Sequence, residues 1–178
     1  MIKSAILHIR VVMRHKREVY KAMKLCGMPI QGVLHDMSKF SPTELFESIK
    51  YFQGGKRSPI EAAKEDKGFS DAWFHHRGRN KHHSQYWCDI SFGEVVPCEM
   101  PWRYVVELVC DTIGAGKVYL GDKWNNSSPI DYYKARDYKS FYHDKTREML
   151  EAIYEDIAEY GWEAIARAIK IGGDIWSR

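Results

Sequence analysis

Residues 1–23 read MIKSAILHIRVVMRHKREVYKAM, and the spacing of their apolar side chains sets our expectation for the whole chain. These side chains recur at steps of three and four residues, which is the spacing of one face of an α-helix. We therefore predict an amphipathic helix over residues 3–25 that ends at Gly27. The residues of its predicted apolar stripe are Ile6, Ile9, Val12, Met13, Val19 and Met23.

Three short segments share a pattern that is typical of helix starts. Residues 41–44, 58–61 and 128–131 each place a serine before a proline and end on an acidic residue. The serine can cap the helix, proline fits its first turn, and the acid complements the helix dipole. We therefore assign Ser41 and Glu44 to capping rather than to catalysis.

The remaining elements are also predicted to be helices. We expect a short helix with Ile30, Val33, Leu34 and Met37, and a longer one that begins at Pro101 and is stopped by Gly114 and Gly116. Residues 143–171 predict two further helices divided near Gly161, and no sustained two-residue alternation indicates a sheet. The predicted fold is an all-α helical bundle, a single domain over 1–178 with C-terminal helices at about 129–171.

Composition excludes several classes of protein. The 178 residues include 44% hydrophobic side chains and carry a formal charge of +3, so the chain can bury a core and has only scattered basic residues. A nucleic-acid partner is therefore disfavoured. Charged residues interrupt the N-terminal apolar stretch, which excludes a membrane span or signal peptide there. The four cysteines form no C-x-x-C pair, and we interpret them as reduced thiols of a cytoplasmic protein.

Four polar residues stand where the pattern calls for apolar ones: His15, His35, Asp36 and Asp111. A buried carboxylate without a partner costs several kcal/mol, so the aspartates need a cation, a metal or strong donors. Together the four side chains offer nitrogen and oxygen ligands suited to Fe, Mn, Zn or Mg. The alternatives are structural: His15 as a core histidine, Asp36 as a cap, and Asp111 in an ion pair with a basic side chain.

The order of these residues resembles the HD-domain superfamily of metal-dependent phosphohydrolases. His15 is followed by Leu34-His35-Asp36-x-x-Lys39 and then by Asp111 on an apolar helix, and the similarity covers about residues 5–115. The segments LHDMSKFSPTELF and AWFHHRGRNKHHSQYW are also similar to small bacterial and phage proteins without an assigned function. The resemblance implies that His15, His35, Asp36 and Asp111 bind a metal. Ser38 replaces the glycine of the familiar HDIGK motif.

Two adjacent histidine pairs lie between Asp36 and Asp111, in FHHRGRNKHHSQYW at residues 74–87. Some HD-type proteins bind a second metal through histidines in this interval. Asn80 is suited to cap a new helix at Lys81, which would bring both pairs to one corner. We expect His76 or His83 to bind metal. The remaining polar residues, His75, His82, Arg77, Arg79 and Lys81, are expected to contact substrate; a solvated polar turn is the alternative.

These residues predict a hydrolase that binds one or two divalent ions and acts on a nucleotide or another small phosphorylated molecule. Lys39 would lie on the face of Asp36, where it could hold a phosphate oxygen or pair with that carboxylate. Three alternatives stay open: a di-iron oxygenase of the same ligand type, a non-catalytic nucleotide- or metal-binding protein, and a nucleic-acid binder. A homo-oligomer is possible. The second His-Asp pair, His143-Asp144, is assigned to helix capping.

Overall fold

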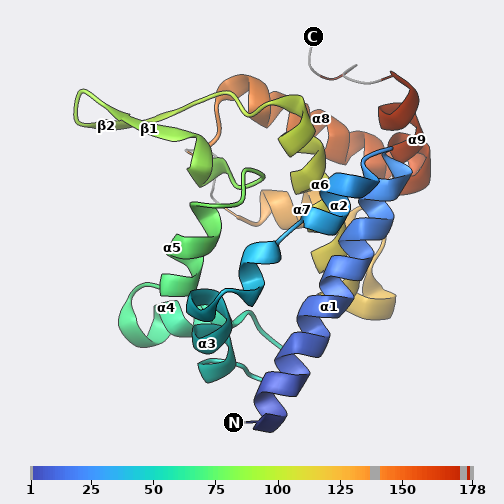
Figure 1. The fold of residues 1–178 in the computed structure, drawn as a ribbon. Helices are drawn as coiled ribbons and strands as arrows, with labels where there is room; N and C mark the ends of the chain where they lie inside the picture. Colours follow the sequence, from blue (N-terminus) through green and yellow to red (C-terminus); the bar gives the residue numbers. More distant parts are fainter. Residues whose placement is uncertain (1, 137–140, 173–175, 177–178) are drawn as a thin grey trace.

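Helix α1 (Ile2–Leu25) packs along α6 (Trp102–Leu120), and this pair forms the frame of the protein (Figure 1). The computed structural model describes residues 2–136, 141–172 and 176. Across these ranges, no helix combines the length and the apolarity needed to cross a membrane. The other α-helices are α2 (Pro29–Leu34), α3 (Pro42–Lys50), α4 (Pro59–Lys67), α5 (Asp71–Arg77), α7 (Ser128–Lys134), α8 (Asp144–Tyr160) and α9 (Trp162–Gly172). Short 3₁₀ turns form η1 (Met37–Phe40), η2 (Ser84–Trp87) and η3 (Gly121–Lys123).

The predicted all-α fold class is confirmed, and both halves of the chain build one core. Helices α8 and α9 are separated at Gly161, as predicted, where φ is 87°. Their apolar faces contact the apolar faces of α1 and α6 in a single cluster. Fully buried members of that cluster include Val19, Met23, Val105, Val109, Ile113, Leu150, Ile153, Ile157 and Ala166.

The buried face of α1 differs from the predicted stripe. Ile6, Ile9 and Met13 are 48%, 38% and 51% exposed. The face that packs against the rest of the protein instead includes His8, Val12, His15, Val19 and Met23. The prediction failed at the N-terminal end, where His8 rather than Ile6 or Ile9 faces the core, whereas the burial of His15 agrees with its apolar position in the sequence pattern. The burial of these two histidines is the first sign that this helix presents polar atoms inward.

Helix α6 begins after Pro101 as predicted, but it is not stopped by Gly114 and Gly116 and continues to Leu120. Both glycines instead allow close packing. A β-carbon on Gly114 would lie 2.5 Å from Cγ2 of Val19 and 3.0 Å from the Val19 backbone nitrogen. The absence of a side chain at this position therefore lets α6 lie directly against α1.

Helix α2 is present, but the apolar residues assigned to it are not its buried side. Ile30, Val33, Leu34 and the following Met37 are each more than half exposed. The buried residue is Gly32, whose β-carbon would lie 2.8 Å from Cβ of Met23 on α1. The contact through a glycine turns the larger side chains of α2 outward.

The three serine–proline segments all start helices, although only one caps as expected. The Ser41 hydroxyl accepts a hydrogen bond from the backbone N–H of Glu44 at 3.4 Å, which confirms the first cap. Ser58 is the N-cap of α4 without a side-chain hydrogen bond. At α7 the N-cap is Ser127, and Ser128 is the first helical residue.

A two-stranded antiparallel hairpin, β1 (Cys88–Ser91) and β2 (Glu94–Pro97), was missed in the sequence and projects from the helices (Figure 1). Cys88 pairs with Pro97 and Ser91 with Glu94. The turn residues Phe92 and Gly93 have φ of 54° and 83°. A phenylalanine rarely takes a positive φ, so the usual Asn-Gly or Asp-Gly signal of such a turn was absent.

The close contact between α1 and α6 leads to a stability prediction. We expect Gly114→Ala to lower the free energy of unfolding by about 2 kcal/mol, because the added methyl group meets Val19. Val19→Ala should also destabilise, by removing buried methyl groups. In denaturant titrations the double variant should lose less stability than the sum of the two, since the smaller side chain admits the methyl group. If the losses of unfolding free energy in the two single variants simply add in the double variant, this contact does not limit the packing.

Candidate metal centre

The contact between α1 and α6 brings two of the predicted ligands together. His15 lies one helical turn before Val19, and Asp111 lies one turn before Gly114. As a result Nε2 of His15 is 3.0 Å from Oδ1 of Asp111. The two side chains come from elements nearly a hundred residues apart, and the close packing at Gly114 positions both.

His35 and Asp36 enter the same place from the junction of α2 and η1. Asp36 has a left-handed backbone conformation with φ 55°, and its carboxylate is almost fully buried. Oδ2 of Asp36 lies 3.3 Å from Nε2 of His35 and 3.6 Å from Nε2 of His15. Lys39 follows one 3₁₀ turn later, rather than on a continuous α-helix, and its Nζ is 2.5 Å from the same oxygen. A strained backbone residue at this point is typical of a functional site.

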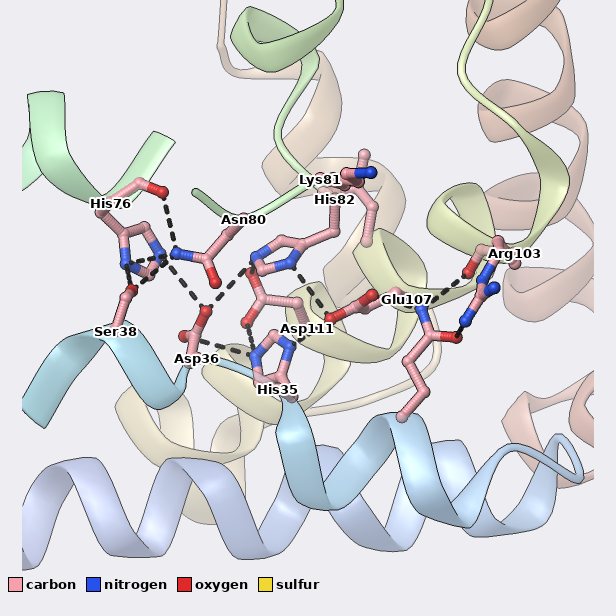
Figure 2. Close-up of polar contacts among 12 residues, drawn as sticks. His35, Asp36, Ser38, His76, Asn80, Lys81, His82, Arg103, Glu107 and Asp111 are labelled. Atoms are coloured by element: carbon pink, nitrogen blue, oxygen red, sulfur yellow. Dashed lines mark hydrogen bonds and ion pairs between the residues drawn. The ribbon is translucent and has the colours of Figure 1, made fainter. Parts of the chain in front are cut away.

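The histidine pairs at residues 75–83 supply two further imidazoles, which face the other carboxylate oxygen of Asp36, and Figure 2 shows His82 beside His35 and His76 on the far side of Asp36. Nε2 of His76 is 3.4 Å from Oδ1 of Asp36, and Nε2 of His82 is 3.6 Å from it. Asn80 does not start a helix at Lys81; its amide donates to Oγ of Ser38 and to the carbonyl of His76, both at 2.8 Å. This bridge closes the turn that returns His82 toward His76.

Two glutamates complete the cluster, and neither was identified from the sequence as a site residue. Nδ1 of His35 lies 2.9 Å from Oε1 of Glu107, and Nδ1 of His82 lies 3.3 Å from the same oxygen. Glu44, which was assigned to capping alone, turns its carboxylate to Nδ1 of His75 at 2.7 Å and of His76 at 2.8 Å. A carboxylate on one imidazole nitrogen fixes the ring and leaves the other nitrogen for a metal.

Several buried polar atoms of the cluster have no hydrogen bond among the described residues. Nε2 of His15, His35 and His82 approaches the carboxylates of Asp36 and Asp111 at 3.0–3.9 Å, but without the geometry of hydrogen bonds. Buried polar atoms are almost always hydrogen-bonded, so this set requires another partner. A divalent cation fits, because lone-pair nitrogens and carboxylate oxygens are its ligands. The atoms without a hydrogen bond are Nε2 of His15, His35, His82 and His83 and both oxygens of Asp36, of which Oδ2 forms the ion pair with Lys39.

The charges of the cluster support the same conclusion. Burial would raise the pKa of Asp36, but His35 and Lys39 hold it well below its usual range. Burial likewise opposes ionisation of Asp111 and Glu107, yet the adjacent His15 and His35 keep the pKa of Asp111 well below normal, and His35 and His82 lower that of Glu107 to about 2. Burial would lower the pKa of His35, but Asp36 and the other two carboxylates raise it well above its ordinary value. Three ionised carboxylates therefore surround a space that favours positive charge.

Asp36 lies between two groups of candidate ligands. Its Oδ2 faces His15 and His35, while its Oδ1 faces His76 and His82. Three sets of ligand atoms are each compact enough to surround one ion: one joins His15, His35, Asp36 and Asp111, another joins His76, His82 and His83, and a third joins His35, His82 and Glu107. The arrangement offers positions for one or two ions, with Asp36 adjacent to both.

The other predicted substrate residues lie outside this centre. His75 is bound to Glu44, and the guanidinium of Arg77 lies over the ring of Phe74 at 4.9 Å. Arg79 and Lys81 line a separate hollow of about 210 Å³ beside Glu107. His82, expected to contact substrate, is 1% exposed and turned toward Asp36 and Asp111, which favours a ligand role.

The fold and the cluster define an all-α protein with a buried histidine–carboxylate centre. The chain belongs to a family of unknown function, DUF5662, whose model matches residues 5–156. Every residue of the candidate centre lies within the matched range. No curated protein matches the chain, and no solved structure does.

Metal content provides the direct test of the centre. We expect protein purified without chelator or affinity tag to contain one or two equivalents of Fe, Mn or Zn by elemental analysis, and His35→Ala to lose them while retaining its helicity by circular dichroism. His143→Ala is the matched control, because His143 also precedes an aspartate but only caps α8. A wild-type protein that binds none of Mn, Fe, Zn and Mg would contradict the metal assignment.

Glu107 gives a second, finer test. Glu107→Gln should weaken metal affinity about 10- to 100-fold, because an amide cannot accept from both His35 and His82 while remaining bonded to Gln31. Titration against a chelating indicator measures the change. Glu18→Gln on α1 serves as control, since Glu18 pairs with Lys21 outside the cluster. Equal affinities of the two variants would show that Glu107 has no part in orienting the ligands.

Proposed function

We propose that this protein is a metal-dependent phosphohydrolase that acts on a nucleotide or another small phosphoester. The observation that carries the proposal is the convergence of unpaired ligand atoms on Asp36 beside a cavity. That cavity has a volume of about 510 Å³, within the range of small-molecule sites, and Asp111 and His83 lie in its wall. A ligand in the cavity would meet the centre directly.

The order of the residues supports placing the chain with the HD-type hydrolases. His15, the His35-Asp36 pair and Asp111 occur in the sequence order of that superfamily, and their side chains approach within 3.0–3.6 Å of one another. Four residues selected by their polarity at apolar positions and by their order therefore meet in space. The free thiols of the four cysteines accord with the cytoplasmic location that we propose.

The reaction sets requirements that the chain's own residues can meet. Hydrolysis forms a bond from a water oxygen to phosphorus, breaks the bond from phosphorus to the leaving oxygen, and delivers a water proton to that oxygen. A divalent ion held by His15, His35, Asp36 and Asp111 would supply a Lewis acid that lowers the pKa of water and neutralises phosphate charge. Glu107 and Glu44 keep the histidine rings oriented for this task.

Lys39 provides a positive charge beside the centre. Its Nζ contacts Asp36, and its side chain is 26% exposed, unlike that of Asp36 at 1%. Burial disfavours the charged amine, but Asp36 and Asp111 raise the pKa of Lys39, so it stays an ammonium. We propose that it partly neutralises Asp36 and attracts a phosphate oxygen that reaches the centre.

Hydrolysis of a panel of phosphomonoesters and nucleotides by metal-loaded protein tests the function. Phosphate release should be detectable for at least one member, and Asp111→Asn should lower kcat/KM by at least about 100-fold through loss of a ligand charge. Asp144→Asn, in the second His-Asp pair, should retain full activity.

No phosphate release from the metal-loaded wild type across the panel would overturn the hydrolase proposal. Iron-dependent oxygen consumption in its place would favour an oxygenase of the same ligand type.

A further inference from the structure

The cavity beside the centre lies between two parts of the fold. One side is formed by α4, α5 and the turn before η2, and the other by α6, α7 and α8. Asp111 reaches it from α6 with a side chain that is 19% exposed, and His83 reaches it from the turn. Asp36 is almost completely covered. The accessible side of the metal centre is therefore the side that faces this cavity.

Most of the cavity wall is aromatic or aliphatic. Trp73 lies next to the metal side, with its ring 4.9 Å from that of His83 in an edge-on contact. Tyr119, Trp124 and Leu108 continue the wall along and beyond α6. A phosphate group alone would not use such a surface. A planar, apolar group attached to the phosphate would bury area against it.

Charged residues gather at the α4 side of the same cavity, and two of the cations lack a counter-ion among the described residues. Glu61 is neutralised by Arg136 at 3.0 Å and by Arg57 at 3.7 Å. In contrast, Lys56 and Lys64 have no ion pair with any residue that the structure describes. Nζ of Lys64 lies over the Trp73 ring, 5.0 Å from its centroid, so a cation without a counter-ion adjoins the aromatic wall.

We propose that the cavity binds the leaving group of the substrate, and that this group contains an aromatic ring and a second anionic group. The inference rests on the proposed phosphohydrolase function. The ring packs against Trp73, the scissile phosphate faces Asp111 and His83, and the second anion is bound by Lys64 with Lys56 at the rim. Specificity for a doubly anionic aromatic phosphoester then arises from α4 and α5, outside the metal ligands.

Three phosphomonoesters separate the parts of this proposal in assays of metal-loaded protein. Glycerol phosphate has neither feature, phenyl phosphate has the ring, and 4-carboxyphenyl phosphate has the ring and a second anion. We expect kcat/KM to rise in that order. Lys64→Gln should lower kcat/KM for 4-carboxyphenyl phosphate about tenfold, and should lower that for phenyl phosphate by much less. Trp73→Leu should lower kcat/KM for both aromatic esters.

Lys67→Gln is the matched control, because Lys67 is on the same helix but pairs with Glu47 and Asp71. If the wild type hydrolyses all three esters equally, or Lys64→Gln acts like Lys67→Gln, the specificity proposal is wrong while the hydrolase proposal stands.

Equilibrium dialysis with 4-carboxyphenyl phosphate tests the opposite case, in which the cavity binds this ligand but the protein does not hydrolyse it. Binding that is weakened by Lys64→Gln, without any phosphate release, would support the cavity as a ligand site and overturn the hydrolase function. If the protein neither binds nor hydrolyses this ester, the cavity proposal is wrong.

Discussion

The contact between Gly114 on α6 and Val19 on α1 is the constraint on which the centre depends. A hydrogen at position 114, in place of a methyl group, lets the two backbones approach closely enough for Val19 to fill the space. His15 and Asp111 are each one turn away from this point, and the 3.0 Å approach of their side chains follows from it. Any larger residue at position 114 would separate the helices and the ligands together. The same glycine thus serves packing and site geometry.

Around this frame, two glutamates determine how the histidines are presented. Glu107 binds Nδ1 of both His35 and His82, and Glu44 binds Nδ1 of both His75 and His76. Since Nδ1 is occupied in each ring, Nε2 of His35, His76 and His82 is directed to Asp36. Each glutamate comes from a different element than its histidines, so the orientation of the ligands depends on tertiary packing rather than on local conformation.

The sequence predicted the fold class, most of the helices and the four central polar residues, because each has a local signal. His15 interrupts an apolar helix face, and Asp111 interrupts an apolar segment. Glu44 was missed because an acidic residue is ordinary in the first turn of a helix, and only its distant partners reveal its role. Glu107 interrupts the same apolar segment as Asp111, so its local signal was present but overlooked. The continuation of α6 past Gly114 was missed for a related reason. A glycine indicates the end of a helix unless its contact with the neighbouring helix, here with Val19, is known. The exposed apolar residues of α2 illustrate the same limit, since the buried Gly32 decides which side faces inward.

The candidate ligands are spread from His15 to Asp111, on α1, the α2–η1 junction, α5 with its following turn, and α6. An unfolded chain cannot assemble such a set, so an ion bound here would bind the native state almost exclusively. By mass action, a free ion concentration 100 times the Kd would add about 2.7 kcal/mol to the free energy of unfolding. That increment is a large share of the marginal stability of an ordinary domain. Metal supply would then control how long the folded protein persists, and a starved cell would hold less of it before any catalytic step is affected.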